Sequence, residues 1–247
     1  MGDARRPGRG AVPRPPAVPP RATDILRELK RRGDRKAAAG LARYGIDASN
    51  AFGVSVGDLK TMARRIGRHH QLALELWSTG QYEARMIAPF VDEPARVTPS
   101  QMDRWAGDFD NWAICDAACF HLFDRTPHAW GRIRAWSGDR REFVKRGAFA
   151  LLASVALHDK AAPDAPFLRA LPLVRRAARD DRNFVKKGVS WALRSVGRRN
   201  ATLHRAAVLT GEALSNADDP TSRWIGRDAL RDLNRPAVRR RLASRTR

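Results

Sequence analysis

The stretch EFVKRG at residues 142–147 returns as NFVKKG at residues 183–188, 41 residues further along the chain. A shortened copy, WIGR at residues 224–227, follows after another 40 residues, and YEAR at residues 82–85 is a weaker one. Each copy places an aromatic residue three positions before a basic residue. A period of about 40 residues matches solenoids in which each unit is a pair of helices. The repeat therefore predicts a stack of helix pairs.

A two-helix unit cannot bury its apolar stripe alone, so such units stack and leave one row of helices along a concave face. In each copy of the repeat, the basic residue lies about 300° around the helix from the aromatic one, at the edge of the same face. We therefore expect an all-α, right-handed solenoid of helical repeats with a basic concave face. Bases from successive repeats are expected to form a stripe that follows phosphates, although simple solvation is the alternative for each base alone.

Helical periodicity fills the chain from Thr23 onward, and Gly, Pro, Asp or Asn interrupts it every 10 to 18 residues. Strand patterns are nearly absent. N-caps are expected at Ser55, at Thr98, at Asp164 and at the pair Asp180–Asp181. The expected helices cover residues 24–32, 34–44, 55–68, 70–78, 80–91, 99–108, 111–124, 127–136, 140–157, 164–178, 182–198, 201–215, 220–233 and 236–243.

The net charge of +21 is spread over the whole chain. Residues 1–22 carry +4 and residues 235–247 carry +6, which leaves +11 for the segment between them. We therefore divide the chain into a Pro- and Arg-rich leader at 1–22 that is expected to be disordered, a repeat domain at 23–234 and a basic tail at 235–247. A basic folded body indicates a polyanionic partner, either nucleic acid or an acidic membrane surface.

Several classes of protein do not fit this sequence. Cys115 and Cys119 have no further cysteines to form a disulfide framework or a four-cysteine zinc site, and they fit a reducing cytoplasm. No run of 18 apolar residues occurs and no apolar segment follows the first arginines, so neither a membrane span nor secretion is expected. Gly-rich phosphate loops, HExxH and Gly-x-Ser-x-Gly are also missing, and we expect neither a metal nor a cofactor.

The most distinctive stretch for chemistry is FDNWAICD at residues 109–116. It places Trp112 and Asp116 four positions apart, which puts both side chains on one face of a helix. An aromatic ring beside a carboxylate is suited to stabilising a cation. By residue type alone, a core Trp and an Asp that is solvated or paired with a base form the simpler interpretation.

With these stretches taken together, the chain resembles the AlkD family of DNA-alkylation-repair glycosylases, which are built from HEAT-like repeats. The resemblance covers roughly residues 24–233. Two positions depart from the family pattern, since Asn111 stands where a second Trp can occur and Ser55 replaces a longer polar residue. The matching stretches are ARY at 42–44, FGV at 52–54, Trp112 with Asp116, FVKR at 143–146 and FVKKGVSWALR at 184–194.

The resemblance implies a site and an activity. Family members release cationic alkylpurines, typically N3-methyladenine and N7-methylguanine, from double-stranded DNA without a metal, a cofactor or a deep base-flipping pocket. Catalytic roles follow for Asp116, Trp112 and Trp191, and a DNA-facing position follows for Arg146. We also expect a monomer of the bacterial cytoplasm that associates with the nucleoid when it binds DNA. Further DNA contacts are expected, from the repeat or from the matching stretches, at Arg43, Tyr44, Lys187, Arg194 and Arg227.

These residue types fit the chemistry. A cationic alkylated purine is a good leaving group, and as its glycosidic bond stretches the sugar becomes oxocarbenium-like, a charge that Asp116 can stabilise while it orients water. Trp112 and Trp191 can each add about 0.5–2 kcal/mol of cation–π attraction, and a neutral base gains less. For Arg146 we consider two roles, a phosphate contact, which we favour, and an ion pair that keeps Asp116 charged.

The alternative is a non-catalytic HEAT-repeat module that binds nucleic acid or an acidic protein with the same basic face. Such a module does not need Asp116, because a carboxylate in the groove repels phosphate. The two hypotheses differ in structure. Asp116 exposed on the concave face between Trp112 and Trp191 favours the glycosylase, whereas Asp116 buried in a salt bridge favours the module.

Overall fold

The computed structural model describes residues 20–244. This part of the chain contains 14 α-helices, three short 3-10 helices and no strand, so the all-α prediction is confirmed. Residues 1–19 of the expected leader and 245–247 of the expected tail lie outside the described residues. The elements are α1 (Ala22–Arg32), α2 (Arg35–Ala39), η1 (Gly40–Tyr44), α3 (Val56–Ile66), α4 (His70–Ser78), α5 (Tyr82–Val91), η2 (Pro94–Arg96), α6 (Pro99–Gly107), α7 (Trp112–His121), η3 (Phe123–Arg125), α8 (Ala129–Trp136), α9 (Glu142–His158), α10 (Asp164–Ala177), α11 (Asn183–Gly197), α12 (Ala201–Ser215), α13 (Pro220–Leu233) and α14 (Pro236–Ala243).

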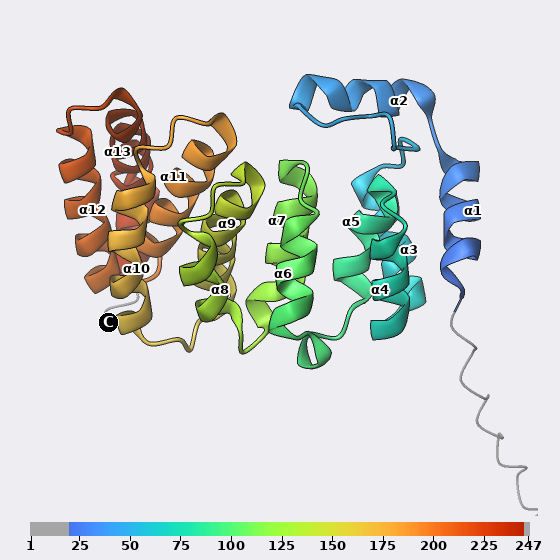
Figure 1. Ribbon diagram of the computed structural model, residues 1–247. Coiled ribbons are helices and arrows are strands. Elements are labelled where there is room, and N and C mark those ends of the chain that lie inside the picture. Colours follow the sequence, from blue (N-terminus) through green and yellow to red (C-terminus); the bar gives the residue numbers. More distant parts are fainter. Residues whose placement is uncertain (1–19, 245–247) are drawn as a thin grey trace, which may run out of the picture.

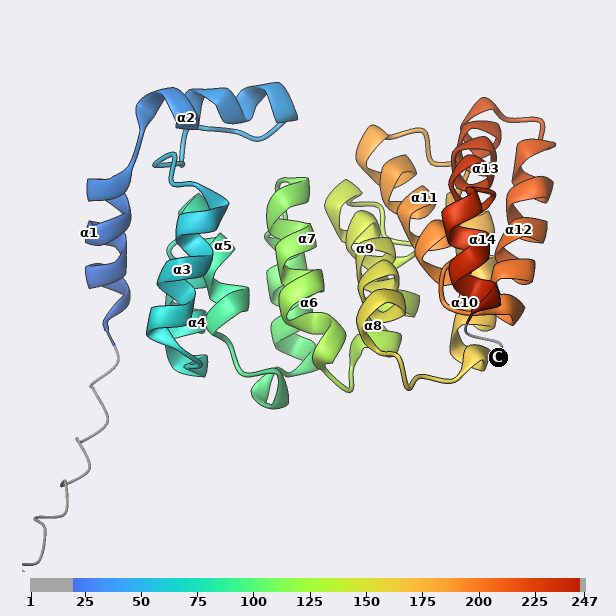
Figure 2. The same ribbon diagram turned by 180° about the vertical axis from the view of Figure 1, so that it is seen from behind.

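The helices form two rows that run along the molecule (Figures 1 and 2). In the inner row, α3, α5, α7, α9, α11 and α13 each pack against the next, while α4, α6, α8, α10 and α12 form the outer row. This is the stack of helix pairs that the sequence repeat predicts. Phe120 of α7 and Trp191 of α11 meet across α9, with 6.5 Å between their ring centroids, so the inner row is concave there.

The segment between α1 and α3 departs from this pattern. The sequence predicts one helix at 34–44, but the structure divides it into α2 and η1, which we call the arm (Arg35–Tyr44). Figure 1 shows the arm lying across the ends of the inner helices. It ends at Gly45, which is left-handed with φ of 71°. The fully buried carboxylate of Glu83 then accepts the backbone N–H groups of residues 52–54 and so ties the return of the chain to α5.

The expected helix caps are correct where the capping residue has no competing partner. Ser55 and Thr98 cap α3 and α6 through their side-chain oxygens. Asp164 and Asp180 do not cap. Helix α10 begins at Asp164 itself, whose carboxylate accepts a hydrogen bond of 2.7 Å from the side chain of Asn200, and Asp180 pairs with basic side chains. At both positions the carboxylate is engaged by other side chains, those of Asn200 in the first case and of Arg182 and Lys145 in the second.

Asp180 joins the loop before α11 to the repeated motif of α9. Its carboxylate accepts hydrogen bonds from Arg182, at 2.6 and 2.8 Å, and from Lys145 at 2.8 Å. The hydrogen bonds from Arg182 and then Lys145 hold the pKa of Asp180 well below its usual range. An aspartate with a lowered folded-state pKa stabilises the fold above its unfolded value of about 3.9, and this contribution is lost as the pH falls toward the folded value.

We therefore expect Asp180→Asn to lower the free energy of unfolding by about 1–2 kcal/mol at pH 7, because the ion pair is partly solvated. Urea denaturation at several pH values measures the effect. The difference from wild type should shrink progressively below pH about 4. The neighbouring exposed Asp181, changed to Asn, is the control and should have little effect. A difference that is as large at pH 3 as at pH 7 contradicts the prediction.

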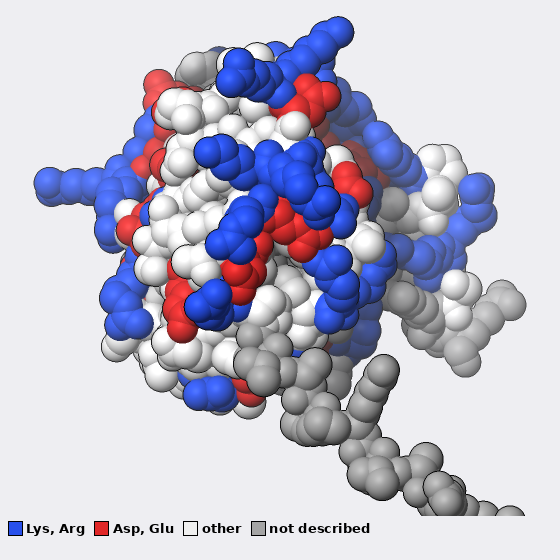
Figure 3. Space-filling view, turned by 90° about the vertical axis from the view of Figure 1, so that its right-hand side faces the viewer, with Lys and Arg blue, Asp and Glu red and all other residues white. Residues whose placement is uncertain are grey.

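The C-terminal helix belongs to the packed body. The charge pattern places residues 235–247 in a basic tail, within which a helix is expected at 236–243. In the structure this helix, α14, packs against α13 and buries Val238 and Leu242. Figure 3 shows the α1 end of the molecule, where Lys and Arg side chains make up most of the charged surface. Between residues 20 and 244, no helix combines the length and the apolar character needed to cross a bilayer.

Candidate functional site

Helix α7 builds the centre of the site. Trp112, Asp116 and Phe120 follow one another at four-residue spacing and share one face of this helix. The buried side chain of Asn111 caps the helix by accepting the N–H groups of residues 113 and 114, which makes Trp112 the first helical residue. The Trp112 indole Nε1 donates a hydrogen bond of 3.0 Å to the carbonyl oxygen of Tyr44. The arm is thereby fixed to the start of α7.

Asp116 and Arg146 form a bidentate ion pair. Nε and Nη2 of Arg146 donate to the two carboxylate oxygens at 2.9 and 2.7 Å, and Nη1 donates to the carbonyl oxygen of Phe184 at 2.8 Å. The pair therefore joins α7, α9 and α11. The side chain of Asp116 is 21% exposed and that of Arg146 is 8% exposed.

Burial sets the electrostatics of this pair. It raises the pKa of Asp116 above the ordinary value for an aspartate, and the charge and hydrogen bonds of Arg146 oppose the shift. For Arg146, burial lowers the pKa and the charge of Asp116 raises it, with a raised pKa as the net result. Each group therefore favours the charged state of the other. A carboxylate can stay ionised in an otherwise apolar setting only with such a partner.

An apolar cavity of about 450 Å³ lies against Asp116. Asp116 is its only carboxylate among the described residues, and Trp112 and Trp191 are part of its wall. The arm closes one side through Leu41 and Tyr44. The lining is Leu41, Tyr44, Ile46, Val56, Tyr82, Met86, Trp112, Ala113, Asp116, Ala117, Phe120, His121 and Trp191.

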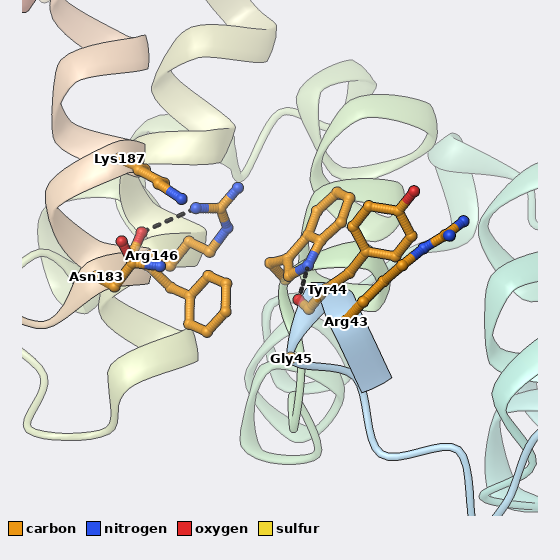
Figure 4. Close-up of a pocket in the computed structure, with 8 residues that line it drawn as sticks. Arg43, Tyr44, Gly45, Arg146, Asn183 and Lys187 are labelled. Carbon is orange, nitrogen blue, oxygen red and sulfur yellow. Dashed lines mark hydrogen bonds between the residues drawn. The ribbon is translucent and has the colours of Figure 1, made fainter. Parts of the chain in front are cut away.

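A second cavity, of about 540 Å³, adjoins the apolar one at the N-terminal end of α7, and we call it the first basic cavity. Figure 4 shows Arg146 and Lys187 on one side of it and Arg43 and Tyr44 on the other. Tyr44 and Trp112 line both cavities and thus separate them. The site has a charged compartment beside an apolar one, with the Asp116–Arg146 pair reaching into both.

The structure gathers seven of the nine expected site residues around these two cavities. They are Arg43, Tyr44, Trp112, Asp116, Arg146, Lys187 and Trp191. The other two lie elsewhere. Arg194 hydrogen-bonds the carbonyl oxygen of Ser190 and lies 3.7 Å from the carboxylate of Asp228, and Arg227 is exposed on α13.

Two members of the expected stripe of phosphate-facing bases have partners within the protein. Arg85 donates to the backbone carbonyls of Trp77 and Asp108, and Arg146 donates to Asp116 and Phe184. Both guanidinium groups connect neighbouring repeats, because the planar fork reaches carbonyl oxygens that the next helix or loop presents. For Arg146 these contacts include the ion pair with Asp116, the second of the two roles considered above, and the phosphate role stays a prediction, since Arg146 also lines the first basic cavity.

The sequence also missed part of the site. Phe120 continues the spacing of Trp112 and Asp116 by one more turn, and this signal was present in the sequence. Tyr82 lines the apolar cavity from α5, and burial raises the pKa of its hydroxyl to about 12, so it stays protonated. Its place in the site depends on how α5 packs. Between residues 20 and 244, no three His, Cys, Asp or Glu side chains are grouped to hold a metal ion.

Fold and site together define a class of protein. It is a helical-repeat protein in which a carboxylate and two indole rings line one apolar cavity, with basic side chains in the adjoining cavity. Residues 25–233 match the model of the DNA alkylation repair enzyme family, and the chain belongs to that family. The resemblance to the HEAT-like glycosylases is thereby confirmed at the level of family and fold.

A solved structure agrees with this assignment of the fold. It is described as a new family of proteins related to the HEAT-like repeat DNA glycosylases with affinity for branched DNA structures. It is 20% identical, with a TM-score of 0.72 over 85% of this chain and 94% of that chain. A designed armadillo repeat protein in complex with the peptide (KR)4 is 13% identical, with a TM-score of 0.41 over 86% and 92% of the two chains. No curated protein sequence matches significantly.

Proposed function

We propose that this protein is a DNA glycosylase that hydrolyses the N-glycosidic bond of cationic alkylated purines, of the N3-methyladenine and N7-methylguanine type, in duplex DNA. The observation that supports this most directly is the Asp116 carboxylate, which lines an apolar cavity together with Trp112 and Trp191 and is held by Arg146. Membership of the DNA alkylation repair enzyme family supports it independently.

The residues of the cavity suit a reaction in which positive charge moves from base to sugar. The alkylated base leaves as a neutral purine, so it needs no proton from the protein. Positive charge then develops on the sugar, and a fixed carboxylate in an apolar setting stabilises it more strongly than water does. The faces of Trp112 and Trp191 add attraction for the same charge. Asp116 also accepts a hydrogen bond from the attacking water, and no metal or cofactor is required by these steps.

In this proposal Arg146 acts on Asp116 and not on the sugar. Its guanidinium keeps the carboxylate ionised against the cost of burial and fixes its direction. The first basic cavity, with Arg43 and Lys187, then binds a phosphate of the damaged strand beside the reacting sugar. One chain contains all of these groups, so a monomer suffices for the reaction. The proposed place of this reaction is the bacterial cytoplasm.

One observation favours the second candidate, a DNA-binding module without catalysis. Both oxygens of Asp116 are engaged by the buried guanidinium of Arg146, and a salt bridge of this kind is the arrangement that we expect of a binding module. The related solved structure is described by its affinity for branched DNA. Two observations favour the glycosylase. The side chain of Asp116 is 21% exposed, and it lines the apolar cavity, whereas a purely structural ion pair does not need access to a cavity.

Release of methylated purines distinguishes the two functions. Purified full-length protein is incubated with duplex DNA that has been treated with a methylating agent, and the free bases are separated by chromatography. We expect release of N3-methyladenine and N7-methylguanine above the spontaneous rate, with no added metal and in the presence of EDTA. Tight binding of the DNA without any release refutes the glycosylase and supports the binding module.

A further inference from the structure

A third cavity lies at the opposite end of α7 from the arm. It has a volume of about 430 Å³ and we call it the second basic cavity. Three basic side chains line it together with Phe90 and His121: Lys60 and Arg64 of α3, and Arg68 just after this helix. His121 also lines the apolar cavity. The three cavities therefore adjoin one another in the order basic, apolar, basic along α7.

Positive charge is concentrated at this second basic cavity. Lys60 and Arg64 are exposed, and in residues 20–244 neither is within ion-pair distance of a carboxylate. Burial, followed by the charges of Lys60, Arg125, His158 and Arg68, lowers the pKa of His121 to about 4. Like charges that repel one another at the mouth of a cavity form an attractive site for an anion.

The spacing of the two basic cavities suggests which anion this is. Helix α7 has ten residues between Trp112 at one basic cavity and His121 at the other, which corresponds to about 15 Å. The inner helices stand across the row that they form (Figures 1 and 2), so a duplex lying along the row has its two backbones near opposite ends of each helix. The grooves of B-DNA are about 6 and 12 Å wide, with a phosphate backbone on either side.

We propose that the second basic cavity binds the backbone of the strand opposite the damaged one. The first basic cavity then holds the damaged strand, and the apolar cavity with Asp116 faces the groove between them. This inference builds on the proposed function in one respect, that DNA lies along the concave face. It predicts that the cavity at Lys60 and Arg64 contributes to duplex binding and not to single-strand binding.

Fluorescence anisotropy with unmethylated DNA tests the proposal without any catalysis. The double variant Lys60→Gln, Arg64→Gln is compared with wild type on a labelled duplex and on its labelled strand alone, over a series of salt concentrations. We expect the duplex affinity to fall about tenfold and the slope of log K against log salt to decrease by about 2, since two phosphate contacts are lost. The affinity for the single strand should stay within about twofold of wild type.

The matched control is Arg175→Gln, Arg176→Gln, which removes the same charge from exposed positions on the outer helix α10 and should change neither affinity. Equal losses on duplex and single strand, or no loss on the duplex, overturn the proposal. Because both probes are unmethylated, a protein that releases no base can still give the expected result, so failure of the glycosylase and failure of this inference are distinguishable.

Discussion

Replacing Asp116 by Asn is expected to lower the rate of methylpurine release by about 10²–10³-fold while the affinity for duplex DNA changes little. The amide keeps the size of the side chain but has no negative charge to set against the sugar. That charge develops only as the glycosidic bond breaks, so the loss falls on the chemical step and not on binding. Single-turnover release at pH 7, with binding measured separately, checks the prediction.

The matched control for this change is Asp228→Asn. Asp228 also lies on an inner helix and pairs with arginines, Arg194 among them, but it lines neither the apolar nor the first basic cavity. We expect it to keep the full rate. Because Asn leaves the buried charge of Arg146 without a counter-ion, thermal melting must confirm that the Asp116 variant is folded at the assay temperature. A folded variant that releases bases at the wild-type rate rules out Asp116 as the catalytic carboxylate.

The pH dependence of the rate gives an additional check on Asp116. Only its ionised form stabilises the sugar, and burial raises its pKa above the ordinary value of about 3.9. The wild-type rate should therefore decline as the pH falls toward that raised pKa. The residual rate of Asp116→Asn should show no such decline.

The sequence predicts the helices well because their signals are local. Apolar spacing and caps such as Ser55 and Thr98 depend on a few neighbouring residues, and the bounds agree closely, as at 70–78 and 201–215. The arm is an exception. Its division at Gly40 into α-helix and 3-10 helix is not predicted by the apolar spacing. The hydrogen bond that fixes its end joins Trp112 to the carbonyl oxygen of Tyr44, which lies 68 residues away in the sequence.

The candidate site divides in the same way. The spacing of Trp112 and Asp116 can be recognised within one helix, and the resemblance to the AlkD family adds Arg146 and Trp191 to the predicted site. The partners of these residues are not visible, because Arg146 meets Asp116 only when α9 packs against α7. The second basic cavity was missed for a related reason. Its members come from α3, the loop after it, α5 and α7, so no single spacing in the sequence brings Lys60 near His121.

The position of the arm depends on a glycine at a crowded turn. Gly53 has φ of 88°, and a Cβ atom built on it would lie 2.0 Å from the carbonyl oxygen of Asp34 and 2.7 Å from the backbone nitrogen of Ala38. From the other side, its N–H donates a hydrogen bond of 2.6 Å to Glu83. The turn is held between the backbone of Asp34 and Ala38 on one side and the carboxylate of Glu83 on the other. It therefore cannot shift to make room for an added methyl group.

Gly53→Ala is therefore expected to destabilise the packing of the arm by about 3 kcal/mol or more, from backbone strain and overpacking together. Because the arm buries few apolar side chains of its own, it should open locally, with amide hydrogen exchange over residues 35–46 accelerated about 100-fold. Tyr44 then no longer meets Trp112, and methylpurine release should fall with it. Gly67→Ala is the control, since Gly67 has φ of 77° but no atom within 4 Å of the added methyl group. If both variants leave the arm equally protected, the close packing at Gly53 does not hold the arm over the site.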